Sequence, residues 1–492
     1  MNGDISAPSM NPSTDQALAG RLPVAPSGRV FASYHTILLT FTAISAASYS
    51  YLVGTSLIAI GNTRIGILGY LVGLVLGIAF VSLAGGAVSF RYGVDTVDAG
   101  KASLGMRGSV VLLFGVLVCT LGWADVLLAM TARATVRLAD ALAAHPDPIS
   151  ETSVAVVGLT FVFAIWVVLK RGVRSLEKVS NYCAAIQLVV AFTLFAFIAI
   201  RHGINKAFLT NASPGHALSL NPVTQMAYAV EFGICNALGM LPYMGGLSRL
   251  VKRSTLLVGP PILGYAVFGA AFIAAIGALA TNITGDSDPS VWILRIAGPY
   301  VGLGLLGAML VANLGAMVAQ VYLAAIAIQQ FKGVARFPWR VIVAAVLIPG
   351  VIISFFTQWA IDHVMNWLVY NGVMFVGLAS VMFVDFFILR RERVAIAQLF
   401  AAHPGRHYWF WGGVNWIAIA VVSGSIVMYL WLFDPISLRV SSGFPYAGAT
   451  LPTVLVSSCA YYGLMKWMIW RSSTIGGYRA SARPEDVVEV SI

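Results

Sequence analysis

Long apolar runs, separated by short polar or charged segments, make up most of this chain. A helix needs roughly 20 apolar residues to cross about 30 Å of hydrocarbon, because every backbone amide there must be bonded within the protein. The pattern predicts an all-α integral membrane protein. Its twelve predicted transmembrane helices cover approximately residues 33–60, 65–90, 108–133, 152–169, 179–200, 223–248, 255–281, 296–331, 341–361, 364–389, 407–433 and 445–468.

The composition agrees with a bilayer environment. Hydrophobic residues make up 59% of the 492 residues and charged residues only 10%, whereas charged residues are about a quarter of an ordinary globular protein. The four cysteines all fall inside apolar runs, without the paired spacing of disulfide frameworks or zinc sites. We therefore expect no disulfide, no structural metal and no cofactor apart from a transported ion.

The positive charge indicates membrane topology rather than nucleic-acid binding. The net charge is +11, and the basic residues gather in short segments between apolar runs. A cytoplasmic N-terminus places the basic clusters at 91–107, 170–178, 249–253, 332–340 and 390–406 on one side, as the positive-inside rule requires. The sequence thus predicts a multi-pass protein of the cell membrane with both termini cytoplasmic. Residues 1–30 and 472–492 are predicted to be disordered tails.

Two predicted spans contain residues that interrupt helices. The first holds the small, hydroxyl-rich segment Ser45–Ser50, and the sixth holds Gly239, Pro242, Gly245 and Gly246. In many secondary transporters, broken helices at corresponding positions of two inverted repeats expose backbone groups to a solute near the bilayer midplane. The alternative is that these small residues only allow close helix packing. Because the two spans lie five apart, we favour a binding site.

Four stretches of the sequence form a set of short motifs in a fixed order. They are the loop after the second span, a Gly-Trp pair in the third, a small-residue run ending in Asp-Phe before a basic pair, and the opening of the eleventh. In this chain they are Gly93–Thr96 with Ala102–Ser109, Gly122-Trp123, Ala379–Phe386 before Arg390-Arg391, and Gly412–Trp416. In their order and spacing these motifs resemble those of the nucleobase:cation symporter-1 family, the purine/cytosine permeases.

The resemblance implies a leucine-transporter-type fold, with a five-plus-five inverted repeat and two peripheral helices. The first repeat would cover residues 31–201, the second 215–392, and the peripheral helices 407–471. It also implies import of a nucleobase or related small heterocycle by alternating access, coupled to Na⁺ or H⁺. We expect a monomer in the bilayer that binds this solute and no nucleic acid.

The resemblance also implies substrate-binding residues. Trp123 matches a tryptophan that stacks on the flat substrate, a suitable use of its large π face. Thr120, one turn earlier, matches a position that bonds the substrate edge, and the alternative is a hydroxyl returned to the helix backbone. Asn236 and Ser48 lie in the two interrupted spans, and Asn313 lies in the eighth. A structural bond between helices is the alternative for both amides. Ala237 departs from the family, which has a second aromatic wall at that position.

The candidates for cation coupling are of two kinds. Sodium-coupled members place two hydroxyl residues in the eighth span, opposite first-span carbonyls near Ala46, but this chain has Val311 and Ala312 there. Glu231 and Asp125 are acids inside predicted spans, where ionisable residues are costly and often functional. We therefore favour protons over sodium. Asp125, about 200° around the helix from Trp123, is a proton carrier or part of a structural pair.

Two other classes of function remain as alternatives. A channel or sensor on the same helices would need a polar stripe along one pore, which the isolated amides and acids do not supply. An intramembrane enzyme would need a metal cluster, a nucleophile with its base, or a phosphate-binding loop, and none of these stands out. The sequence therefore favours a transporter and not an enzyme.

Overall fold

The structure is a computed structural model that describes residues 23–143, 150–170, 176–203, 208, 217–329, 333–334, 336–400, 403–404, 406–472 and 475–478. Over these ranges the chain is helical and forms only isolated β-bridges. Seven helices there are long and apolar enough to cross a membrane, or eight if the bent pair Tyr34–Ser45 and Ser48–Ile60 is one span. Trp339–Ile353 and Trp416–Leu432 are shorter apolar helices. The total of twelve spans stays a prediction.

The first half of the chain supplies the helices of the predicted first repeat. They are α2 (Tyr34–Ser45), α3 (Ser48–Leu57), α4 (Thr63–Val81), the π-helical turn η3 (Ser82–Gly86), α5 (Ala87–Tyr92), α6 (Thr96–Leu104), α7 (Val110–Leu142), α8 (Glu151–Leu169) and α9 (Leu176–Arg201).

The second half supplies the remaining helices. They are α11 (Pro222–Leu238), α12 (Leu241–Ser248), α13 (Gly259–Pro261), the π-helical turn η5 (Ile262–Ala271), α14 (Phe272–Thr284), α15 (Pro289–Ala297), α16 (Pro299–Ile328), α17 (Trp339–Val346), α18 (Ile348–Ile353), α19 (Thr357–Asp362), α20 (Val364–Phe383), the π-helical turn η6 (Val384–Leu389), α21 (Ile396–Leu399), α22 (Trp416–Leu432), α23 (Phe444–Ala447) and α24 (Thr450–Arg471).

Both predicted interruptions are present. Between α2 and α3 the chain bends by 66°, because Ala46 and Ala47 leave helical geometry, with ψ angles of 61° and 163°. Between α11 and α12 the interruption is a tight turn at Gly239 and Met240. Two alanines at the first break and Gly239 at the second allow the departure, and each break leaves backbone groups without the regular helical bonds.

Glycines bring the interrupted spans unusually close to two other helices. A Cβ added to Gly73 of α4 would lie 2.0 Å from the Val230 carbonyl oxygen of α11, and one on Gly277 of α14 would lie 2.1 Å from the Tyr51 oxygen of α3. The sixth span thus packs on the second, and the first packs on the seventh. In a five-plus-five inverted repeat, the first and second spans correspond to the sixth and seventh, so the two contacts are equivalent. The repeat boundaries stay a prediction.

The motifs that carry the family resemblance meet at one end of the bundle. Arg107 donates its backbone N–H to the Gly413 carbonyl at 2.7 Å, and the Asn415 amide donates to the Ser103 carbonyl at 2.7 Å. Arg390 forms a buried ion pair with Asp385, with Nε to Oδ2 at 2.6 Å. Its Nη2 donates to the Ala102 carbonyl at 2.6 Å. These motifs therefore join the loop before α7 to the ends of the tenth and eleventh spans.

Two predicted boundaries need correction. The eleventh span was expected to begin at 407, but α22 begins at Trp416, because Gly412 and Gly413 have positive φ angles and Asn415 caps the helix. Within the predicted C-terminal tail, residues 475–478 pack on the bundle, where the Tyr478 hydroxyl donates to Asp385 Oδ1 at 2.5 Å. Residues 1–22 and 479–492 of the predicted tails lie outside the described residues.

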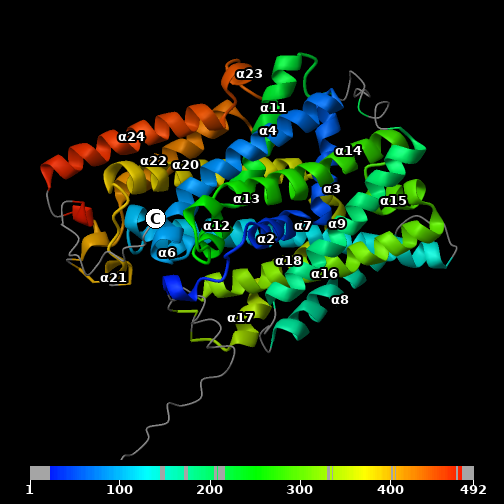
Figure 1. Cartoon of the computed structure of the whole chain (residues 1–492), viewed down its shortest axis with the longest axis horizontal. Coiled ribbons are helices and arrows are strands. Elements are labelled where there is room, and N and C mark those ends of the chain that lie inside the picture. Colours follow the sequence, from blue (N-terminus) through cyan, green and yellow to red (C-terminus); the bar gives the residue numbers. More distant parts are fainter. Residues whose placement is uncertain are drawn as a thin grey trace, which may run out of the picture.

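The last two long helices lie at the edge of the bundle. Figure 1 shows α22 and α24 beside α20 on one side of the molecule, and α8 and α17 on the opposite side. The interrupted helices α2, α3, α11 and α12 lie between these two sides (Figure 1). This arrangement places both interruptions in the interior, where α7 and α16 also run.

Candidate functional site

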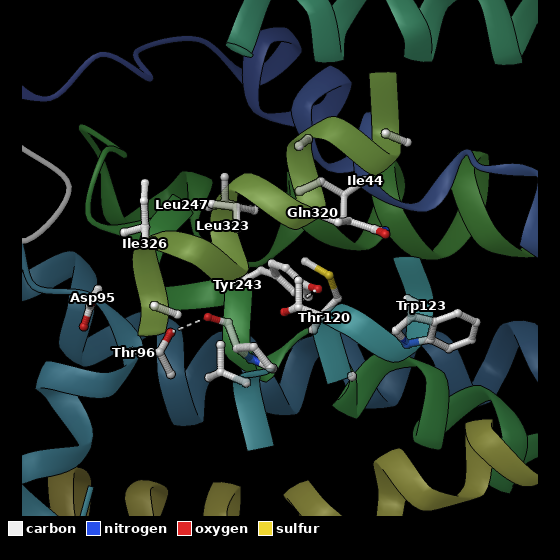
Figure 2. A pocket seen from close by; sticks show the side chains of 18 of the residues that line it. Ile44, Asp95, Thr96, Thr120, Trp123, Tyr243, Leu247, Gln320, Leu323 and Ile326 are labelled. Carbon is white, nitrogen blue, oxygen red and sulfur yellow. Dashed lines mark hydrogen bonds between the residues drawn. The ribbon is translucent and has the colours of Figure 1, made fainter. Parts of the chain in front are cut away.

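A cavity of about 270 Å³ lies beside both interruptions. Its walls come from α2, α3, α7, α12, η5 and α16, together with the start of α6. Figure 2 shows Trp123 at one end of this cavity and Asp95 with Thr96 at the other. The cavity therefore extends from the middle of α7 to the basic end of the bundle, at which Arg249 follows α12.

Aromatic rings form the inner end of the cavity. Trp123 packs on Tyr49 of α3, with ring centroids 4.7 Å apart and planes tilted by 39°. Tyr243 of α12 and Tyr265 of η5 also line it. Aromatic pairs of this kind are stabilised beyond their buried area, and their faces suit a flat guest. The structure thus places Trp123 in the cavity, while its stacking on a substrate stays a prediction.

Polar groups along the walls are few. Thr120 lines the cavity as predicted, and its Oγ1 accepts a hydrogen bond from the Tyr243 hydroxyl at 3.0 Å. Gln320 of α16 also lines it, and no donor among the described residues reaches its buried Oε1. A buried acceptor without a partner is costly, so Gln320 is well placed to bond a ligand.

The end of the cavity opposite Trp123 is lined by charged residues. Asp95 caps α6 by accepting from the Asp98 N–H at 2.7 Å, and Arg249 lines the same end. Burial, and then the nearby charge of Asp98, raise the pKa of Asp95 to about 6, while Arg249 acts in the opposite direction. Burial also lowers the pKa of Arg249. Thr96 holds this end to α12, since it accepts from the Gly245 N–H at 2.9 Å.

Asn236 and Ala237 lie outside the cavity lining. The Asn236 amide donates to the Tyr70 hydroxyl and accepts from the Tyr265 hydroxyl at 2.9 Å. It therefore connects α11 to α4 and to a cavity tyrosine, and its contact with a substrate stays a prediction. Ala237 is fully buried against α4, where a Cβ on Gly77 would lie 2.4 Å from it. An aromatic side chain at 237 would collide with α4, so Tyr49, Tyr243 and Tyr265 supply the cavity's other aromatic walls.

Asn313 and Ser48 lie together in a second, fully buried polar group. The Asn313 Nδ2 donates to Ser48 Oγ at 2.9 Å and to Thr131 Oγ1 at 3.2 Å. Its Oδ1 accepts from Gln187 Nε2 at 2.9 Å. None of these four side chains lines the cavity. Direct contact of Asn313 or Ser48 with a substrate stays a prediction.

Glu231 faces the peripheral helices. Its carboxylate accepts from the Tyr429 hydroxyl of α22 at 2.7 Å and from the Ala449 and Thr450 N–H groups at 3.0 Å. The Thr450 hydroxyl donates to it as well. A carboxylate at a helix N-terminus bonds the unpaired N–H groups there and interacts favourably with the helix dipole. Glu231 therefore anchors α24 to α11, and it does not line the cavity.

The other coupling candidates are dispersed. Asp125 faces away from Trp123 into a small gap between α7, α8, α16 and the α17–α18 pair, among apolar side chains. Ala46 lies buried at the first interruption and Ala312 is buried in α16, whereas Val311 is 57% exposed on the outer face of the bundle. Their coupling roles stay predictions. Within the described residues, no group of acidic, cysteine or histidine side chains could hold a metal ion.

Residues 24–443 match a single family model, described as a permease for cytosine/purines, uracil, thiamine and allantoin. The chain belongs to this permease family. The family match establishes a multi-pass membrane protein whose role is transport rather than catalysis. No curated protein matches this permease.

Solved structures share the fold of this permease. A closed form of Mhp1, a nucleobase-cation-symport-1 family transporter with bromovinylhydantoin bound, matches over 96% of this chain and 99% of its own, with a TM-score of 0.68 and 14% identity. The inward-facing form of Mhp1 matches over 94% and 97%, with a TM-score of 0.71 and 16% identity. A Na⁺-coupled sialic acid symporter in a substrate-bound outward-open state matches over 91% of both chains, with a TM-score of 0.55 and 13% identity. The leucine-transporter-type fold is thereby confirmed.

Sequence reasoning missed several residues of the permease site. Tyr49 follows Ser48 in the first interruption, and Gln320 lies two turns beyond Asn313 on α16, so helix periodicity could have indicated both. Tyr265 and Gln187 carried no comparable signal. Their positions depend on how the seventh and fifth spans rotate against their neighbours.

Proposed function

We propose that this permease is a secondary active symporter that imports a nucleobase or related flat heterocycle by alternating access. One observation carries the proposal: an aromatic cavity lies beside both helix interruptions, at the midpoint of α7. Family membership supports transport of solutes of this class, and the similar solved transporters named as cation symporters support coupling to an ion. Transport of this kind involves no covalent chemistry, so the protein is not an enzyme.

The cavity chemistry supports a flat, weakly polar guest. Trp123, Tyr49, Tyr243 and Tyr265 offer ring faces and edges, while Gln320 Oε1 offers an acceptor for an N–H on the heterocycle edge. A purine or pyrimidine presents both features. A hydantoin or a vitamin-like heterocycle presents them too, and these are the related solutes to compare.

The proposed coupling ion is the proton. Ala312, buried in α16, offers no side-chain oxygen for sodium, and Val311 lies on the outer face of the bundle. Among the acids inside the predicted spans, Asp385 is paired with Arg390, and Glu231 already accepts several hydrogen bonds at α24. Asp125 lies among apolar side chains, where an ionised carboxylate is costly and a bound proton removes that cost. Asp125 is therefore the proposed proton carrier.

The proposed orientation places both termini, and the end of the cavity that Asp95 and Arg249 line, in the cytoplasm. The cavity reaches Asp95 and Arg249, next to the basic loops that the positive-inside rule assigns to that side. In this conformation a solute beside Trp123 would leave the cavity toward the cytoplasm, as expected of an importer in its inward-facing state. The working unit is a monomer in the cell membrane.

Uptake into proteoliposomes tests the function. Labelled purines, pyrimidines and hydantoins are offered with a proton gradient, with a sodium gradient, and with neither. Gradient-driven accumulation of a heterocycle is expected, and passive equilibration alone would indicate a channel. Trp123→Ala should abolish uptake, whereas Trp467→Ala, at an exposed tryptophan of α24, is the matched control. Undiminished uptake by Trp123→Ala would show that the solute does not bind at the proposed site.

A further inference from the structure

Four neutral side chains meet where the first span is interrupted. Ser48 begins α3, Thr131 lies in α7, Gln187 in α9 and Asn313 in α16, and each is at most 2% exposed. We call this set the amide cluster. It joins four helices at a position separate from the cavity. However, Tyr49, the residue after Ser48, packs on Trp123 inside the cavity. Ser48 of the amide cluster is therefore the sequence neighbour of a residue that lines the proposed substrate cavity.

The hydrogen bonds of the amide cluster run from donor to acceptor in one direction, from Gln187 through Asn313 to the two hydroxyls. Gln187 donates to Asn313 Oδ1, and Asn313 donates through Nδ2 to both Ser48 and Thr131. The two hydroxyls donate onward, Thr131 to the Leu127 carbonyl at 2.6 Å and Ser48 toward the Met130 sulfur at 3.8 Å. Since an amide has donors on one side and an acceptor on the other, Gln187 fixes which side of Asn313 faces the interruption.

The side-chain amide of Gln187 is itself held in an orientation that costs free energy. Its Oε1 is buried and finds no donor among the described residues. Rotating the amide by half a turn would set two carbonyl oxygens, those of Gln187 and Asn313, against each other. Leaving an acceptor unpaired costs less than opposing it to another acceptor and losing the donor as well. The orphaned oxygen therefore indicates that the orientation of Asn313 is strongly determined.

We infer that Gln187 is a positioning residue that keeps the amide nitrogen of Asn313 between Ser48 and Thr131, where it takes the place of a bound sodium ion. At interrupted helices in this class of transporter, a cation can bind the oxygens that the break exposes. Here an N–H donor already lies between the hydroxyl oxygens of Ser48, at the start of α3, and of Thr131 in α7, and it links these two helices to α16. Movement at the first interruption then depends on the amide pair and proceeds without sodium.

This inference rests on the proposed transport function, and the two can fail separately. If no heterocycle is taken up under any gradient, the function is refuted. If uptake occurs but requires sodium, the function stands and the role given to the amide cluster is refuted. The expected result is equal uptake by the wild-type permease in sodium chloride and in choline chloride.

Two variants test the role of the amide pair directly. Gln187→Ala frees Asn313 to turn, and the expected effect is a maximal uptake rate lower by about tenfold, the scale of one lost hydrogen bond, with an unchanged KM. Gln225→Ala is the matched control. Gln225 is also buried, donates to a carbonyl, that of Ser219 at 2.9 Å, and has an unpaired Oε1, but lies at the start of α11. Wild-type rates in Gln187→Ala would overturn the inference.

A binding measurement separates positioning from simple packing. Asn313→Asp replaces the donor nitrogen with a carboxylate oxygen beside the two hydroxyl oxygens of Ser48 and Thr131, which leaves a buried negative charge that needs a cation. Sodium chloride should then raise the unfolding temperature of Asn313→Asp relative to choline chloride, and should not do so for the wild-type protein. A sodium-specific rise in the wild type, or none in the variant, would overturn the inference.

Discussion

Replacing Glu231 by glutamine tests whether this acid anchors a helix or carries protons. The carboxylate accepts hydrogen bonds from the Tyr429 hydroxyl, from the Ala449 and Thr450 N–H groups and from the Thr450 hydroxyl, and a longer one from the Cys235 thiol. Glutamine keeps the shape but turns an NH₂ group toward N–H donors, so it loses about two charge-assisted bonds and leaves donors unpaired. Each such bond contributes roughly 1.5–3 kcal/mol. With partial relaxation, we expect Glu231→Gln to lower stability by about 2–4 kcal/mol.

The assay is thermal unfolding of the purified protein in detergent, run beside proton-driven uptake. Tyr429→Phe is the graded control, because it removes a single bond to the same carboxylate and should cost about 1–2 kcal/mol. We expect the unfolding temperature to fall in the order wild type, Tyr429→Phe, Glu231→Gln, while the folded variants still respond to a proton gradient. An unchanged unfolding temperature in Glu231→Gln, combined with loss of proton-driven uptake, would refute the anchor and restore Glu231 as a coupling residue.

Three further predictions concern the cavity and its surroundings. Gln320→Leu should raise the KM for a heterocycle about tenfold by removing one acceptor, measured as concentration-dependent uptake; an unchanged KM would exclude a substrate contact. Asp125→Asn should abolish accumulation driven by a proton gradient but retain exchange of labelled for unlabelled solute, and continued proton-driven accumulation would exclude Asp125 as the carrier. Because burial raises the pKa of Asp95 from 3.8 to about 6, this group contributes stability that is fully present below pH 3.8 and is lost as the pH rises through about 6. The substituted asparagine would still cap α6, so in Asp95→Asn the unfolding temperature should change less with pH between 3.8 and about 6. An unaltered dependence of the unfolding temperature on pH would contradict the raised pKa of Asp95.

The fate of the polar residues shows the limits of helix periodicity. Periodicity placed Asp125 on the face of α7 opposite Trp123, and the structure agrees. Glu231 was a coupling candidate because it lies inside the sixth predicted span, yet its partners Ala449 and Thr450 lie more than two hundred residues later in the chain. The pattern within one helix defines the relative directions of its side chains. It does not define which neighbouring helix each direction meets.

The sequence by itself determined the membrane environment, the family and the two interrupted spans. Each depends on local properties: apolar runs long enough to cross hydrocarbon, motifs in a fixed order, and small residues that weaken a helix. Only the tertiary structure decided that Tyr49, Tyr243 and Tyr265 join Trp123 around the cavity, and that Gln187 orients Asn313. The physical reason is that these contacts join separate helices, whose relative rotation is set by packing glycines such as Gly73 and Gly277 against neighbouring backbones.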